Sequence, residues 1–352
     1  MIALYLAHAR SFFRDPAGLM LTLALPPFVY LMFAAIFGAA AGGDLDLRIA
    51  LHDGANAPAS AAITERLADR HGGRLRLVSS RDEVDRKVLE GEADVGVILF
   101  ACPIAPACTE VVAHPGRATA GQALQGELLT LSAPALPSGA SPVRFRAVGP
   151  RGDPLALYYA GGVSLMFVFF AAMHGALGWL DDRRNGLLAR LSLAAGGLGR
   201  VLAARAAWMI TVGVAQTTLV FALAIRHAPA PDLVTVAAWM VTTLVVAAAA
   251  AGLALGLIAL CRTRDQAEPV TTVAALLAAA LGGSMAPRFL MPEAFRTLGW
   301  ITPHAWGIDA YTAVVWQGAI GPAVYGAWAV LVLFATVGFV VSAVMERRRQ
   351  NG

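Results

Sequence analysis

Two neighbouring carboxylates, Asp181 and Asp182, are the side chains whose spacing could support acid–base chemistry. They stand beside Arg183 and Arg184 at the end of an apolar run, where a solvated charged loop is the simpler interpretation. The sequence contains one lysine, Lys87, whereas a phosphate-binding P-loop needs a glycine-rich turn that ends in Gly-Lys-Ser/Thr. We therefore expect no ATP site of this type in the chain.

Histidines and cysteines give no pattern typical of a metal site. The seven histidines are scattered, and no Cys/His group has the spacing of metal ligands. His174 lies within an apolar run and could relay protons, or it could be a neutral imidazole hydrogen-bonded inside a helix bundle. Cys102 and Cys108 flank a short Pro-containing loop and could form a disulfide or remain two thiols. We expect no metal and no cofactor bound by this chain.

The composition indicates a membrane protein. Hydrophobic residues make up 58% of the 352 residues, charged residues only 14%, and the mean hydropathy is +0.64. About 20 consecutive apolar residues are needed to cross a bilayer, and the sequence has six such runs. We therefore predict a polytopic α-helical membrane protein with six transmembrane helices. The runs cover residues 17–41, 156–180, 203–225, 233–260, 268–287 and 321–345.

The first 41 residues combine two elements. Residues 1–16 alternate apolar and basic faces at helical spacing, which predicts an amphipathic helix on the inner membrane surface. Residues 17–41 then form the first span. A cleaved signal peptide is the alternative, because three alanines end the run, but signal peptides usually have apolar regions of about 7–15 residues.

Arginines predict the orientation of the spans. The segments before the first span, between the second and third, after the fourth and after the sixth are rich in arginine. With six spans all these segments lie on one side, so both termini are predicted to be cytoplasmic. The net charge of +4 is then a consequence of topology, and no nucleic-acid partner is expected.

Residues 43–154 are predicted to form an extracytoplasmic α/β domain. Strands are expected at 47–51, 74–78, 93–100 and 111–113, and helices at 57–70, 81–90 and 117–131. Residues 134–154 are rich in Pro, Ser and Gly and are interpreted as a linker. The remainder, residues 155–352, contains the second to sixth spans.

The segment before the last span is too broken by Pro and Gly to cross a membrane. Three prolines stop helices, and three tryptophans favour the headgroup zone. We predict short helices over residues 288–318 that lie along, or dip into, the outer membrane face. These residues are Pro287, Pro292, Pro303, Trp300, Trp306 and Trp316.

Four sequence stretches occur in order along nearly the whole chain. They are RDP at Arg14–Pro16, EGEADVGVILF at Glu90–Phe100, DDRRNGLLARLSLAAGGLGRVLAAR at Asp181–Arg205, and GGSMAPRFLMPEAF with LGWITPHAWGIDA within Gly282–Ala310. In these the chain resembles the membrane (permease) subunit of type-two ATP-binding cassette (ABC) exporters, in the subfamily with a large external domain after the first span. Two positions depart from the family pattern, Leu187 where Thr is common and Ala194-Ala195 where Pro is expected.

The resemblance implies a bacterial inner-membrane transporter subunit that moves cargo mechanically. Two permease copies, forming a homodimer or heterodimer, would bind two ATPase subunits that hold ATP and Mg, and the external domain could contact a periplasmic adaptor. The amphipathic helix and the coupling loop 181–202 would dock the ATPase, through Asp181, Asp182, Arg183, Arg184, Gly186 and Arg190. A hydrophobic cargo would pass Phe167, Phe170, Met173 and His174. The external gate would comprise Met285, Pro287, Met291, Pro292, Pro303 and Trp306.

Two other functions remain possible from the sequence. In one, a partner ATPase moves the external domain of a scaffold that transports nothing. In the other, the chain is an ion-coupled carrier, although His174 is the sole ionisable candidate inside a span. Gly252 and Gly256 form a G-x-x-x-G pattern that allows close helix packing, which we expect within one subunit rather than between two.

Overall fold

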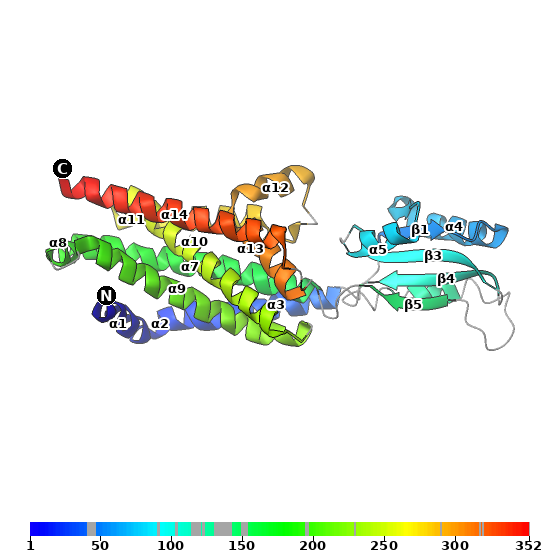
Figure 1. Ribbon diagram of the computed structural model, residues 1–352, viewed down its shortest axis with the longest axis horizontal. Helices are drawn as coiled ribbons and strands as arrows, with labels where there is room; N and C mark the ends of the chain where they lie inside the picture. The colour runs from blue at the N-terminus through cyan, green and yellow to red at the C-terminus, as the bar shows by residue number, and fades with distance from the viewer. Residues whose placement is uncertain are drawn as a thin grey trace. The chain divides into compact units, whose positions relative to one another are not determined.

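The chain forms two compact units, described here from a computed structural model. One unit is helical and combines Met1–Ala34 with Ala156–Gly352, and the other is an α/β unit, Ala35–Leu155 (Figure 1). The structure describes residues 1–40, 47–89, 92–102, 105–113, 121, 124–129, 143–148, 154–193, 197–228, 230–288, 291–316, 318 and 320–351.

The α/β unit is built on a five-stranded mixed sheet with the order β2-β1-β3-β4-β5. Strand β1 pairs in parallel with β2 and β3, β3 pairs antiparallel with β4, and β4 pairs in parallel with β5. The strands are β1 (Ile49–Asp53), β2 (Leu75–Leu77), β3 (Val95–Cys102), β4 (Ala105–Ala113) and β5 (Val143–Ala147).

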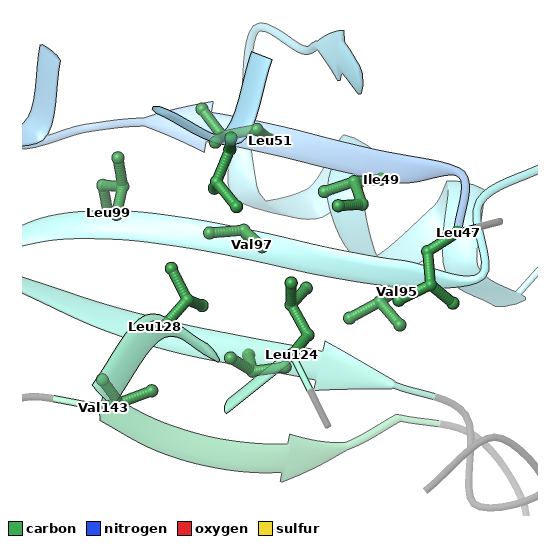
Figure 2. Packing of buried hydrophobic residues seen from close by; sticks show 11 residues of the cluster. Leu47, Ile49, Leu51, Val95, Val97, Leu99, Leu124, Leu128 and Val143 are labelled. Atoms are coloured by element: carbon green, nitrogen blue, oxygen red, sulfur yellow. The ribbon is translucent and has the colours of Figure 1, made fainter. Parts of the chain in front are cut away.

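Helices cover both faces of this sheet. The larger core lies under α4 (Pro58–His71) and the helical residues 124–129, and Figure 2 shows Leu124 and Leu128 pointing toward β3 and β5. On the opposite face α5 (Arg81–Leu89) buries Val84 against Ile98 and Val112. Because both faces are covered, β3 is apolar along most of its length rather than alternating.

The sequence prediction of a small α/β region is confirmed, with one difference in its extent. Residues 134–154 are not simply a linker, since 143–147 form β5 at the edge of the sheet. Arg146 on β5 pairs with Asp85 of α5 at 2.8 Å and Glu110 of β4 at 2.9 Å. The expected helix 117–131 lies only partly within the described residues. Cys102 and Cys108 form a disulfide across the β3–β4 hairpin.

Among the described residues, five helical stretches are long and apolar enough to cross a membrane. These stretches are Pro16–Ala35, Ala156–Arg184, Gly197–Ala224, Leu233–Leu260 and Pro322–Arg349. The first consists of α2 (Pro16–Leu19), a π-helical turn Met20–Ala24 and the start of α3 (Leu25–Ala40). The others belong to α7 (Pro154–Arg184), α9 (Gly197–Ala224), α10 (Leu233–Leu260) and α14 (Pro322–Asn351).

The fifth predicted span, 268–287, is not among these five. Its residues belong mostly to α11 (Arg264–Gly282), whose first turns carry Arg264, Asp265 and Glu268. These charges shorten the apolar part of the helix. Thr263 caps its start by accepting a hydrogen bond from the backbone N–H of Gln266 at 3.3 Å.

Contacts between the helices show that their directions alternate along the chain. Helices α7 and α9 are antiparallel: Asp182 pairs with Arg205, while a Cβ at Gly213 would lie 3.2 Å from Val168. Helix α11 begins beside Asp181, the partner of Arg264, and Ser284, two residues after its end, lies against Gly162, so α11 runs antiparallel to α7. It covers the distance from one end of α7 to near the other.

Helices α10 and α14 run parallel with their backbones in contact. A Cβ added at Gly252 would lie 2.5 Å from the carbonyl oxygen of Ala335, and one at Gly256 would lie 2.8 Å from that of Gly338. The G-x-x-x-G pattern therefore packs within this chain, as expected from the sequence. Near the α14 N-terminus, Trp328 Nε1 donates a hydrogen bond to Thr242 Oγ1 at 2.9 Å.

Short helices occupy the segment before α14. They are α12 (Glu293–Leu298), a 3₁₀ turn Gly299–Ile301 and α13 (Pro303–Tyr311). Helix α13 lies antiparallel to α7: its His304 ring stacks on Phe169 with centroids 4.4 Å apart, and Tyr311 packs on Gly161. Between these two contacts α13 runs alongside about eight residues of α7, which is a distance of roughly 12 Å.

Candidate functional site

The last turn of α7 contacts helices on both sides of it. Asp182 pairs with Arg205 of α9, and the adjacent Asp181 pairs with Arg264 of α11. Consecutive residues of a helix are separated by about 100°, so these carboxylates point in different directions. Both carboxylates therefore have partners on other helices and belong to the last turn of α7 rather than to a loop, although both side chains stay partly exposed.

Arg205 is the most buried member of these ion pairs, with a side chain 7% exposed. Besides Asp182, its guanidinium donates to the backbone oxygen of Gly175 at 3.1 Å and lies 5.8 Å from the ring centroid of Trp179. A buried charge requires a paired counter-charge and hydrogen bonds. Arg205 thus fixes the start of α9 against the end of α7.

The third consecutive charge, Arg183, faces α14. Its Nη2 is 2.7 Å from Glu346 Oε2, which also accepts a hydrogen bond from Trp179 Nε1 at 3.3 Å. One turn further along α14, Arg349 donates to the backbone oxygen of Cys261 at the end of α10, at 2.9 Å. We call these residues the ion-pair cluster: Asp181, Asp182, Arg183, Arg205, Arg264 and Glu346.

The amphipathic helix α1 (Ile2–Phe13) packs on the same part of α9. Tyr5 and Phe12 both lie edge-on to Trp208, at 5.4 and 5.6 Å between ring centroids, and Tyr5 Oη donates to Thr211 Oγ1 at 3.1 Å. Burial, and then the charge of nearby Arg205, lower the pKa of His8 to about 4. His8 is therefore neutral at physiological pH.

Beyond α7 the chain turns at Gly186 into the short helix α8 (Leu187–Ser192). Gly186 has φ of +69°, a left-handed conformation that favours glycine. Leu188 is buried, whereas Leu193 is 89% exposed and Leu187 and Arg190 are also exposed. Figure 1 shows α8 at the same end of the helical unit as both chain termini. We call this the loop end, and Leu187, Arg190 and Leu193 the α8 tip.

The predicted coupling loop therefore divides into two groups. Asp181, Asp182 and Arg183 are held by other helices, whereas Arg184 and Arg190 are exposed. Helix α7 continues to Arg184 and α9 begins at Gly197, so the non-helical part is shorter than the expected 181–202.

Four α7 residues were predicted to line a path. Phe167, Phe170 and His174 lie on one face of the helix, half-buried or exposed, although most other positions of α7 are buried. Phe167 and Phe170 have ring centroids 6.5 Å apart. Met173 is 7% exposed and is buried within the chain. The structure thus groups three of the four residues on a single face.

At the opposite end, Arg288 joins α13 to α7. Its Nη1 is 2.9 Å from Asp309, its guanidinium lies 3.9 Å from the centroid of Trp300, and its backbone N–H donates to Tyr158 Oη at 3.1 Å. Tyr158 in turn donates to the backbone oxygen of Gly283 at 2.8 Å. This network fixes the short helices at the end of the bundle that lies away from α8.

The six predicted gate residues are distributed around this network. Met285 and Pro292 are exposed, Met291 and Trp306 are half-buried, and Pro287 and Pro303 are buried. Trp306 Nε1 donates to the backbone oxygen of Trp300 at 2.8 Å. Within the segment from 288 onward, α13 is mostly buried, whereas α12 has no buried residue.

Sequence reasoning did not find the partners of the charged loop. Arg205, Glu346 and Arg288 stand in or beside apolar runs. In the sequence, a charge that is paired inside the protein looks the same as a charge that only flanks a span. His304 was also missed; it is completely buried, whereas His174 is exposed. Among the described residues, no group of three or more His, Cys, Asp or Glu side chains could hold a metal ion.

Long apolar helices, paired charges at their ends and a separate α/β unit define a polytopic membrane protein. The family model of ABC-2 family transporter proteins matches residues 16–344, nearly the whole chain. The chain therefore belongs to the ABC-2 family of transporter proteins, which are membrane permease components without an ATP-binding domain of their own. Membership implies an ABC ATPase as partner. No curated protein matches the chain.

Proposed function

We propose that this chain is the permease subunit of an ABC exporter in a bacterial cytoplasmic membrane. It moves a hydrophobic or amphipathic compound outward with ATP that a separate subunit hydrolyses. The observation that carries this proposal is the loop end, where an exposed α8 tip follows directly on a helix turn tied to other spans. The family match over residues 16–344 supports it.

Six membrane crossings fit this function. The 19 residues of α11 would extend about 28 Å, close to the roughly 30 Å of a bilayer core. Its start at Asp181 and its end near Gly162 support a crossing alongside α7, in the opposite direction. With six spans, both termini and α8 lie in the cytoplasm, in agreement with the arginine distribution, and α12 and α13 lie at the external face.

The α8 tip is the proposed ATPase-docking surface. Leu187 and Leu193 are exposed apolar side chains on either side of Arg190, so together they offer a contact for a complementary pocket. A push on α8 is transmitted to the end of α7 through the turn at Gly186. The ion-pair cluster then distributes it to α9, α11 and α14.

The half-exposed face of α7 is the proposed lining of the cargo path. Phe167 and Phe170 offer aromatic surface to an apolar cargo, and a second permease copy would close the path on the side that this chain leaves open. Gate residues near Arg288 would bound the path at the external end. The external α/β unit could receive cargo or contact an adaptor.

Docking is tested by co-purifying the ATPase with variants of the tip. Leu193→Glu should reduce the recovered ATPase at least tenfold, because it places a charge in an apolar contact. Leu77→Glu is a matched control, since Leu77 is an exposed leucine on β2 of the α/β unit, outside the helical unit that carries α8. Undiminished recovery with Leu193→Glu, or equal loss with the control, would contradict docking at the α8 tip.

A further inference from the structure

Three arginines meet at the loop end around a single carboxylate. Arg183 at the end of α7 pairs with Glu346 at 2.7 Å, and Arg349 of α14 reaches the end of α10 through its bond to Cys261. Arg262 directly follows Cys261 in the chain, so this bond places Arg349 beside Arg262. We call Arg183, Arg262 and Arg349 the arginine cluster. The arginine cluster contains three guanidinium groups. Among the described residues, Glu346 is the carboxylate that is paired with it.

This cluster has more cationic donors than acceptors. Within it, Arg183 Nε and Arg349 Nη1 are buried and have no hydrogen-bond partner among the described residues. Like charges at close range repel, and buried N–H groups without an acceptor are unfavourable. An anion beside the cluster would reduce the repulsion between its guanidinium groups. Its exposed side is open to such an anion, since Arg262 is exposed and the Arg183 side chain is 25% exposed.

The position of the cluster indicates which anion it meets. Helices α7, α10 and α14 all have the length and apolarity of membrane spans, and their ends meet here. Residues at the end of a span lie at the depth of lipid headgroups. A lipid phosphate is therefore the anion at highest local concentration.

We propose that the arginine cluster binds the phosphate of an anionic phospholipid at the ends of α7, α10 and α14. A guanidinium presents paired N–H groups that match phosphate oxygens, and basic pockets between spans bind acidic headgroups. The lipid would link three helices through one headgroup. This site depends on the helices crossing a membrane and not on transport, so it can be tested without the ATPase.

The test measures the thermal unfolding midpoint (Tm) of the full-length chain in nanodiscs. Discs of phosphatidylcholine alone are compared with discs containing one-fifth phosphatidylglycerol. A site occupied at tenfold excess over its Kd should raise the Tm by about 2–3 °C. Arg349→Gln and Arg262→Gln should each remove at least half of this shift. Arg262 is exposed, so its variant should fold even if that of Arg349 does not.

Arg348→Gln is the matched control because Arg348 is exposed, adjacent in sequence, and not among the charged groups that act on Arg349. It should keep the shift. An equal loss with Arg348→Gln would indicate diffuse attraction and overturn the proposal, as would the absence of any shift with phosphatidylglycerol. Inorganic phosphate added to phosphatidylcholine discs should have little effect. If it reproduces the whole shift, the site binds free phosphate instead of lipid.

Discussion

Arg205 illustrates how one side chain holds the loop end together. Its guanidinium contacts Asp182, the Gly175 backbone and the face of Trp179, and the side chain is 7% exposed. Removing one partner of a buried ion pair leaves the other charge buried and unpaired, which is the costly change. Asp182 and Arg205 should therefore depend on each other for stability.

Arg205→Gln should destabilise the helical unit by about 3 kcal/mol, because Asp182 would lose its partner. A thermal melt of the purified chain measures this as a fall in Tm. The reversed pair, Asp182→Arg with Arg205→Asp, should recover part of the loss. Arg190→Gln on exposed α8 should leave the Tm unchanged. A single variant as stable as the wild type would show that the pair does not hold α7 to α9.

His8 should make the packing of α1 sensitive to acid. Its pKa of about 4 in the folded chain lies below its ordinary value of 6.5 because of burial and Arg205. The unfolded chain binds the proton more tightly, so the contribution to stability is complete above pH 6.5 and is lost as the pH falls toward 4.

The Tm should therefore decrease between pH 7 and pH 5, and His8→Gln, which cannot take up this proton, should decrease less over that range. Parallel melts of both proteins at several pH values measure the difference. Identical pH profiles would mean that His8 gains its proton as easily in the folded chain as in the unfolded one.

For the residues of the ion-pair cluster, the sequence indicated the charged side chains but not their ion-pair partners. Asp181, Asp182 and Arg183 were predicted to lie in a charged loop, whereas the structure places them in the last turn of α7 with partners on other helices. Their partners are 23 to 163 residues away in the sequence, as for Asp182–Arg205 and Arg183–Glu346. Such pairings depend on how the helices pack, which a single sequence does not specify.

The α10–α14 pair is the element where close packing is most evident. Gly252, Gly256 and Gly338 let the two backbones touch, and a Cβ at Gly338 would lie 2.2 Å from the carbonyl carbon of Gly252. Without a hydrophobic driving force between helices in lipid, such backbone contact is a main source of association. Any added side-chain atom must separate the helices.

Gly338→Ala should destabilise the chain by about 1–3 kcal/mol through this overpacking. Gly326→Ala, on the same helix, is the matched control, because its added Cβ would have open space around it. That control should be neutral or stabilising by about 0.5–1 kcal/mol, since alanine favours helix over glycine. The two melts are compared directly, and a Gly338 variant that is no less stable than its control would contradict the packing.

Elements with strong periodicity were predicted well from the sequence. The long apolar helices and most of the α/β unit have lengths and patterns that local physics determines. Strand β5 was missed because its sequence, Val143–Ala147, carries two arginines within a Pro- and Gly-rich stretch. Arg146 satisfies its charge by pairing with Asp85 and Glu110, contacts made only after folding.

As a whole, the molecule combines a helical unit and an α/β unit in a chain of the ABC-2 family. The family and the membrane class were accessible from the sequence, since composition and the ordered motifs both indicate them. The transported compound could not be predicted from the sequence. The α7 face of Phe167, Phe170 and His174 is mainly apolar and has few polar groups that would specify a ligand.

The most direct test of the account is ATP-driven efflux from vesicles that contain the purified chain and its ATPase. Fluorescent hydrophobic compounds are loaded, and their loss and ATP hydrolysis are followed together. We predict that at least one compound leaves only when ATP and both subunits are present, and that it also stimulates hydrolysis. If hydrolysis requires this chain but responds to no compound in a broad panel and no efflux occurs, the chain is a scaffold and the account is wrong.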